Sequence, residues 1–308
     1  MTGFRDRLTA AAAAHGPLCV GIDPHPGLLE AWGLPVDAAG VERFGRTVVE
    51  ALAESVALLK PQVALFEVYG AAGLAALERV LADARDAGVL TVADAKRGDI
   101  GSTMAAYARA WLADTSPLAA DAVTLSPYLG VGALAPALDL AAATGRGVFV
   151  LARTSNAEAA AVQSAQVFAR GGGTGGTGRP MVREVAQGVV DALVAHHREH
   201  PDAAGVGGVV VGATGGTTGR EHGLDLAALH APVLVPGLGA QGAGVEDVVR
   251  AFTGPGGPPG PVIASSSREI LAVGPGPAAL RAAVAPLAEQ LAEGLGRRPG
   301  GGGGEEPR

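Results

Sequence analysis

Eight short apolar runs, most of them rich in β-branched residues, recur along the chain. Each is followed by a break of Gly, Pro, Ser or other polar residues and then by a stretch rich in Ala and Leu. Continuous apolar strands that alternate with helices are typical of a parallel sheet covered on both faces. Eight such units at a spacing of roughly 30 residues favour a closed barrel over an open doubly wound sheet. The sequence therefore predicts an α/β fold, a single-domain (β/α)8 TIM barrel, with strands at 18–22, 59–68, 89–93, 122–125, 147–152, 208–211, 233–235 and 262–264.

Amphipathic stretches separate these runs, and two Gly-rich segments fall outside the pattern. The clearest helical stretches are 71–87, 102–113 and 180–200. Residues 170–180 (RGGGTGGTGRP) interrupt the fifth strand–helix unit and predict a mobile loop; the absence of a following Gly-Lys-Ser/Thr argues against a P-loop. Residues 297–308 cannot bury a core and predict a disordered tail. We therefore expect one catalytic barrel domain over residues 1–296 that includes the Gly-rich loop.

Composition and charge limit the classes of partner. The chain has 23 basic and 30 acidic side chains, a formal net charge of −7, so it has no general attraction for nucleic acid or an anionic membrane. Cys19 is the only cysteine, and its apolar neighbours predict a buried side chain. No apolar run reaches the roughly 20 residues of a membrane span, and the N-terminus lacks a signal-peptide core. We expect a soluble, cytoplasmic protein.

Polar residues stand at the end of every predicted strand. In a parallel barrel the strand C-termini and the loops after them build the active site, so a charged residue there has a higher functional expectation than one on a solvated surface. The residues at these ends are Asp23, Lys60, Asp94, Lys96, Asp99, Ser126, Thr154, Ser155, Asn156, Thr214, Gln241 and residues 265–268.

The third predicted strand carries the most informative pattern, VLTVADAKRGDIGST. Asp94 and Lys96 are two residues apart, so on a strand they point to the same face. Lys60 would project from the neighbouring strand and complete an alternating array of Lys and Asp. Flanking carboxylates favour the charged form of Lys96, which could then donate a proton. A purely structural cluster of ion pairs has the same spacing and remains an alternative at this point.

The string DAKRGDIGST resembles the Asp-x-Lys-x-x-Asp signature of the orotidine 5′-phosphate decarboxylase family, and the resemblance extends over residues 15–290. CVGIDP is similar to the family's first strand, and KPQVALFEVYG to the second strand of its longer bacterial subgroup. PGLGAQGA resembles the seventh loop and ASSSREI the eighth. The resemblance implies a (β/α)8 barrel that converts orotidine monophosphate to uridine monophosphate in pyrimidine biosynthesis, with no metal and no organic cofactor.

The same resemblance implies roles for individual residues. Lys60, Asp94, Lys96 and Asp99 would form the catalytic network, with Asp94 beside the scissile carboxylate and Lys96 protonating C6. Asp99 and Thr103 would reach into the partner's site in a homodimer with shared active sites. Asp23 would hold the ribose hydroxyls and Ser155 the pyrimidine. Gln241 and Arg268 would bind the phosphate, together with backbone N–H groups of residues 237–242 and of the stretch around Ser266 and Ser267.

The histidines show no pairing typical of metal ligands. His196, His197 and His200 cluster at the polar end of a predicted helix, where we expect exposure to solvent, and His25 alone lies near the predicted mouth of the barrel.

Two other functions compete with the decarboxylase. A metal-assisted sugar-phosphate decarboxylase or aldolase on the same barrel would need a further acidic metal ligand. Glu67 is the one spare carboxylate in a predicted strand, and its place in KPQVALFE matches the decarboxylase subgroup instead. A non-catalytic barrel that binds uridine monophosphate is the second alternative, although all four network residues are present.

Overall fold

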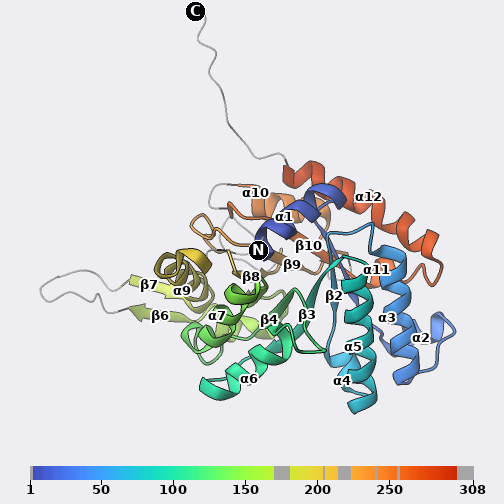
Figure 1. Ribbon diagram of the computed structural model, residues 1–308. Coiled ribbons are helices and arrows are strands. Elements are labelled where there is room, and N and C mark those ends of the chain that lie inside the picture. The colour runs from blue at the N-terminus through green and yellow to red at the C-terminus, as the bar shows by residue number, and fades with distance from the viewer. Residues whose placement is uncertain are drawn as a thin grey trace, which may run out of the picture.

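The computed structural model describes residues 3–169, 181–203, 205–213, 223–239, 242–254 and 257–296. Parallel strands form a closed barrel at the centre of the fold (Figure 1). It has eight strands, and β1 pairs with both β2 and β10. The predicted (β/α)8 barrel is thus confirmed. The barrel strands are β1 (Leu18–Ile22), β2 (Leu58–Pro61), β3 (Leu90–Arg97), β4 (Ala122–Leu125), β5 (Gly147–Arg153), β8 (Gly207–Val211), β9 (Val233–Pro236) and β10 (Val262–Ser266).

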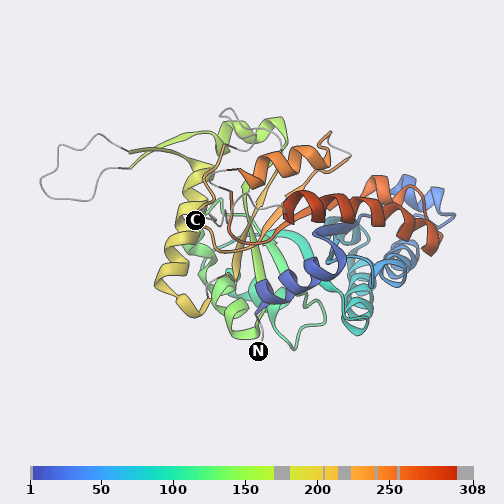
Figure 2. The ribbon, with the colours of Figure 1, turned by 90° about the horizontal axis from the view of Figure 1, so that it is seen from above.

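Helices surround the strands on the outside of the barrel (Figures 1 and 2). Their amphipathic pattern explains this arrangement: in α3, the buried residues Val41, Phe44, Val48 and Leu52 recur every three or four positions. The helices are α1 (Phe4–His15), α2 (Pro26–Ala31), α3 (Ala38–Leu52), α4 (Ala64–Glu67), α5 (Gly70–Asp86), α6 (Gly101–Leu112), α7 (Ala135–Thr144), α8 (Ala160–Gln163), α9 (Val185–Glu199), α10 (Val245–Thr253), α11 (Arg268–Leu271) and α12 (Pro277–Gly296). Across the described ranges, we find no helix with the length and apolar character needed to cross a membrane.

The second strand is shorter than its sequence predicts. We expected a strand over 59–68, but β2 ends at Pro61 and residues 64–67 form the short helix α4. Proline has no N–H to donate to a neighbouring strand, so it favours the end of the ladder there. The apolar residues that follow bury Phe66 as part of a helix rather than as part of the sheet. Glu67, expected inside a strand, is therefore a helical residue.

A hairpin that the sequence did not predict lies outside the barrel. The helix expected over 180–200 begins only at Val185, because residues 181–184 form strand β7 (Met181–Glu184). β7 pairs antiparallel with β6 (Gln166–Ala169), and the hairpin projects to one side of the molecule (Figures 1 and 2). Val167 and Val182 of the hairpin are exposed, so these strands are not buried like those of the barrel. Their sequences therefore lack the continuous apolar pattern by which the barrel strands were predicted. The Gly-rich segment 170–180 and the tail 297–308 lie outside the described residues.

Helix α1 closes one end of the barrel. Its buried Phe4 and Leu8 pack into the cluster of side chains that fills the barrel interior, which also contains Cys19. The ring of Phe4 meets that of Phe149 edge-on at 5.9 Å. A Cβ atom on Gly147 would lie 2.2 Å from Phe4 Cδ1, so glycine is required where the helix crosses this strand. Cys19 is buried, as predicted. This end is filled, and a ligand must enter from the other.

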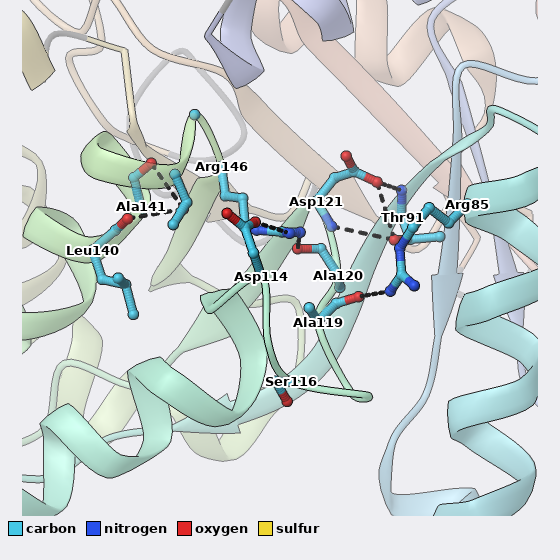
Figure 3. A network of polar contacts seen from close by, with 12 residues as sticks. Arg85, Thr91, Asp114, Ser116, Ala119, Ala120, Asp121, Leu140, Ala141 and Arg146 are labelled. Carbon is cyan, nitrogen blue, oxygen red and sulfur yellow. Dashed lines mark hydrogen bonds and ion pairs between the residues drawn. The ribbon is translucent and has the colours of Figure 1, made fainter. Parts of the chain in front are cut away.

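Polar contacts fasten the strand starts at the same end (Figure 3). Asp121, just before β4, accepts hydrogen bonds from Thr91 N at 3.0 Å and from Thr91 Oγ1 at 3.2 Å, and it pairs with Arg7 at 2.5 Å. Arg85 donates to Ala119 O at 3.0 Å and Arg146 to Ala120 O at 2.8 Å. Because this face lies opposite the strand C-termini, we interpret the network as one that stabilises the barrel.

The histidine cluster at the end of α9 is less exposed than predicted. His200 is exposed, but His196 and His197 are half-buried because this face of the helix packs towards the strands. A Cβ atom on Gly207 of β8 would lie 3.3 Å from His197 Nε2. Burial is the main cause that lowers the pKa of His197 to about 4, with a further contribution from His196.

Candidate active site

A cavity of 640 Å³ opens at the C-terminal end of the barrel strands. Residues from all eight barrel strands or the loops after them contribute to its lining. The lining includes Asp23, His25, Lys60, Gln62, Glu67, Asp94, Lys96, Arg97, Thr124, Ser155, Gly237, Leu238, Ser265, Ser266, Ser267 and Arg268. The predicted mouth of the barrel and the position of His25 near it are therefore present in the structure.

Asp94 is the centre of the polar network in this cavity. Lys60 Nζ donates to Asp94 Oδ2 at 2.9 Å, and Lys96 Nζ donates to Asp94 Oδ1 at 2.6 Å. The side chains of Lys60 and Asp94 are each 9% exposed, whereas that of Lys96 is 46% exposed. Both lysines that the sequence placed near Asp94 contact it directly, and Lys96 is the most exposed of the three groups to a ligand in the cavity.

The charges of this group stabilise one another. Burial alone would raise the pKa of Asp94, but the ammonium groups of Lys60 and Lys96 outweigh it and hold that pKa well below its ordinary value. Burial alone would lower the pKa of Lys60, but the carboxylates of Asp94 and Asp23 raise it above its ordinary value. Asp94 is therefore a carboxylate and Lys60 an ammonium group at neutral pH.

Lys96 has an unusual backbone conformation. Its φ of 49° is the one positive value among the non-glycine residues of the described ranges. It lies in an irregular part of β3, where the pairing with β4 shifts between Ala93 and Arg97. The contact between Lys96 and Asp94 thus forms through a bulged strand, not through the regular alternation that the spacing suggested.

Three oxygen atoms at the mouth are buried and unpaired. Asp23 Oδ1, Ser266 Oγ and Ser267 Oγ have no hydrogen-bond partner within the described part of the chain. A Cβ atom on Gly21 would lie 3.0 Å from both Asp23 Oδ1 and Ser267 Oγ, so these two oxygens lie close together. Because buried polar atoms are nearly always paired, such a group indicates a site for a polar ligand.

The residues expected to bind phosphate are only partly described. Arg268 lines the cavity as an exposed residue at the start of α11, whereas Gln241 lies outside the described residues. Thr214, expected at the end of the sixth predicted strand, also lies outside them. Gly239, with φ 79°, allows the loop after β9 to approach α11, since a Cβ atom there would lie 1.8 Å from Glu269 Oε2.

Three backbone N–H groups in the described part of this loop are engaged within the protein. Leu238 N donates to Ser265 O, Gly239 N to Ala243 O and Gly242 N to Gly239 O. These three N–H groups are therefore not the free phosphate donors that we expected from residues 237–242.

Asp99 and Thr103 do not belong to the cavity of their own chain. Asp99 is half-buried in the loop before α6, and its Oδ1 accepts a hydrogen bond from Ile100 N at 2.8 Å. Thr103 is exposed on α6. Ser155, by contrast, lines the cavity after β5 as predicted.

Three polar residues of the cavity, Gln62, Arg97 and Thr124, were not predicted from the sequence. Thr124 is the one polar residue within β4, and a polar residue near the end of an apolar strand was the signal that could have revealed it. Arg97 follows Lys96, pairs with Glu67 of α4 and lies over the ring of Tyr107 at 5.9 Å. In the described ranges, no three His, Cys, Asp or Glu side chains come together in a group able to hold a metal ion.

Comparisons with known proteins agree on one family. Residues 16–172 match the model of the orotidine 5′-phosphate decarboxylase / HUMPS family. The orotidine 5′-phosphate decarboxylase of Salinispora arenicola is 54% identical over 283 residues, which cover 92% of this chain and 95% of that protein. The enzyme of Salinispora tropica is 53% identical over the same proportions. The crystal structure of a putative orotidine 5′-phosphate decarboxylase from Streptomyces avermitilis is 47% identical and superposes with a TM-score of 0.81, over 96% of this chain and 97% of that one. The chain therefore belongs to the orotidine 5′-phosphate decarboxylase family.

Proposed function

We propose that the family's reaction, the decarboxylation of orotidine 5′-phosphate to uridine 5′-phosphate in pyrimidine biosynthesis, is carried out here by Lys60, Asp94 and Lys96. The observation that carries this assignment is the single carboxylate of Asp94 held between two ammonium groups at the base of the cavity. Lys96 is the more exposed of the two lysines, so it is the group that can contact the pyrimidine.

The reaction breaks the bond between C6 and the carboxylate carbon of the substrate. Carbon dioxide leaves, and the electron pair of that bond remains at C6. The Lys96 ammonium group donates its proton to C6, and the neutral amine then regains a proton from solvent. Asp94 lies beside Lys96 and keeps the proton donor in place, while its negative charge faces the region that the substrate carboxylate must leave.

One ion pair cannot account for the rate of an enzyme. Two unit charges about 4 Å apart at an effective dielectric constant of about 20 attract each other by about 4 kcal/mol. Enzymes lower barriers by about 8–23 kcal/mol. Binding energy from the phosphate and ribose must therefore contribute, by closing loops and by removing water from the pyrimidine end. Arg268 at the rim and the unpaired oxygens of Asp23 and Ser267 are placed to supply such contacts.

We further propose that the active protein is a homodimer in which Asp99 and Thr103 complete the partner's site. Both residues lie outside the cavity of their own chain. Ile100, next to Asp99, is 62% exposed, and Tyr128 in the loop after β4 is 83% exposed. These loops follow neighbouring strands, and a Cβ atom on Gly98 would lie 2.4 Å from Ser126 O. Exposed apolar side chains beside a strand-end acid support a surface that a second subunit covers.

Turnover by the purified protein tests the function directly. Orotidine 5′-phosphate is added with and without a metal chelator, and the loss of substrate and the formation of uridine 5′-phosphate are followed. We expect equal rates in both samples. Loss of activity with the chelator would indicate a metal-assisted reaction. Tight binding of uridine 5′-phosphate with no turnover would indicate a binding protein.

A further inference from the structure

Thr124 connects two members of the catalytic group through one hydroxyl. Its Oγ1 donates to Asp94 Oδ1 at 2.9 Å and accepts a hydrogen bond from the backbone N of Lys96 at 3.0 Å. The side chain is 1% exposed, so water does not compete for these contacts. Thr124 is on β4, whereas both of its partners are on β3, so the hydroxyl joins the two strands at the base of the cavity.

The irregular pairing of β3 and β4 explains why a side chain is needed at this point. Ala93 pairs with Val123 and Arg97 pairs with Leu125. Residues 94–96 of β3 therefore lie opposite a single residue of β4, Thr124. Inside such a bulge, a backbone N–H has no regular ladder partner. The hydroxyl of Thr124 takes that place for Lys96.

The conformation of Lys96 depends on this support. A positive φ in a residue with a side chain costs on the order of 1–3 kcal/mol and persists only where the surroundings hold it. The backbone N of Lys96, one of the atoms that define its φ of 49°, donates the hydrogen bond to Thr124 Oγ1. Between Thr124 and Asp94 the hydroxyl must be the donor, because an ionised carboxylate has no proton to give, and its oxygen still has a lone pair to accept from Lys96 N.

On the basis of the proposed function, we propose that Thr124 is a positioning residue for proton transfer. Its hydroxyl fixes the left-handed backbone of Lys96 and the orientation of the Asp94 carboxylate, so that the ammonium group points at the reacting carbon. It contacts neither the phosphate nor the ribose, which the proposed site places near β1, β9 and β10. Its removal should therefore affect the chemical step and not substrate binding.

Thr124→Val and Thr124→Ser separate the hydroxyl from the shape of the side chain. In Thr124→Val we expect kcat to fall about 10- to 100-fold with KM within about threefold of wild type, because a small misplacement of a reacting group can cost about a hundredfold in rate. Thr124→Ser keeps the hydroxyl and should retain kcat within about fivefold of wild type. If Thr124→Val does not fold, Thr124→Ala removes the same hydroxyl and gives the same test.

Thr91 provides the matched control. It is a buried threonine of the same barrel, 4% exposed, and its hydroxyl bonds to Asp121 at the opposite end (Figure 3). Thr91→Val should lower the stability to unfolding and leave kcat and KM unchanged. A fall in kcat for Thr91→Val equal to that for Thr124→Val would show a general effect of lost packing and overturn the proposal.

Three results for the Thr124 variants would also overturn it: a kcat for Thr124→Val within threefold of wild type, a loss confined to KM, or equal losses in the Val and Ser variants. Wild-type protein measured in parallel separates this inference from the proposed function. Absence of turnover by the wild type contradicts the function itself, whereas equal turnover by wild type and Thr124→Val contradicts only the role of Thr124.

Discussion

Lys60 and Lys96 donate hydrogen bonds to different oxygens of one carboxylate, that of Asp94, at 2.9 and 2.6 Å. They are also the only two lysines in the sequence, and every other basic residue among its 23 Lys and Arg is arginine. An arginine guanidinium does not give up its proton in proteins, whereas a lysine ammonium group can. The chain thus uses lysine only at the two positions where a compact charge or a transferable proton is required.

Lys96→Ala should abolish decarboxylation while the fold remains intact. The variant removes the one proposed donor to C6 and leaves Arg268 and the strand ends unchanged. Circular dichroism should match wild type, and calorimetry should still detect binding of uridine 5′-phosphate. Retention of more than about a tenth of wild-type kcat, a loss below about 1.4 kcal/mol, would show that another group donates the proton.

Lys96→Arg distinguishes charge from proton donation at the same position. Arginine preserves the positive charge beside Asp94, but its proton is held too tightly to be transferred. We expect activity as low as in Lys96→Ala. Activity closer to wild type would mean that the charge of Lys96, and not its proton, is what the reaction needs. The two variants together therefore test the mechanism independently of the fold.

Mixing two inactive variants should restore activity. Asp99→Ala and Lys60→Ala are each expected to be inactive, because Asp99 serves the partner's site and Lys60 serves its own. In a mixed dimer, one site then carries both defects and the other carries neither. Activity is measured before and after subunit exchange, with exchange verified by native mass spectrometry. If activity does not recover although mixed dimers form, Asp99 acts within its own subunit.

Arg268→Ala should weaken recognition of the phosphate. The residue begins α11 at the rim of the cavity, and a guanidinium group can make two parallel hydrogen bonds to phosphate oxygens. We expect KM for orotidine 5′-phosphate to rise strongly, and kcat can fall as well because remote binding energy assists the chemical step. Any residual reaction of orotidine, which lacks the phosphate, should hardly change. Equal losses for both substrates would remove Arg268 from the phosphate site.

Stability should fall in mild acid because of His197. Its pKa in the folded protein is about 4, below the ordinary value of about 6.5, so the folded state keeps the ring neutral. The unfolded chain binds the proton first, and stability present above pH ~6.5 is lost as the pH falls towards 4. Because the ring is only partly buried, we expect a loss of about 1–2 kcal/mol, less than the ~3.4 kcal/mol that the whole shift would give at ~1.4 kcal/mol per pKa unit.

Urea unfolding at pH 7.5 and pH 5 measures this effect. His197→Gln should reduce the difference in the free energy of unfolding between the two pH values, whereas His200→Gln, on the exposed end of the same helix, should leave it unchanged. The expectation is contradicted if wild type and His197→Gln lose the same stability on acidification.

Local patterns in the sequence determined the architecture and most of the candidate site. The apolar run at β1 predicted both of its ends, since every residue of that strand is buried and a run of this length between two breaks favours a buried strand over a helix. The strand-end rule placed Asp23, Lys60, Asp94 and Lys96 at one cavity, because parallel strands present their C-termini at one end of the barrel. These inferences needed only short-range periodicity and a known topology.

Tertiary contacts decided what periodicity could not express. The strand expected to continue to residue 68 ends early, and the chain forms α4, in which Phe66 is buried. The hairpin of β6 and β7 depends on pairing between residues on either side of the Gly-rich segment 170–180. Lys96 meets Asp94 through a bulge with a positive φ, and its backbone is held by Thr124 from the next strand. Spacing along one strand specifies which side chains share a face. The hydrogen bond that holds the bulge at Lys96 comes from Thr124, 28 positions away in the sequence, so it forms only once the barrel has folded.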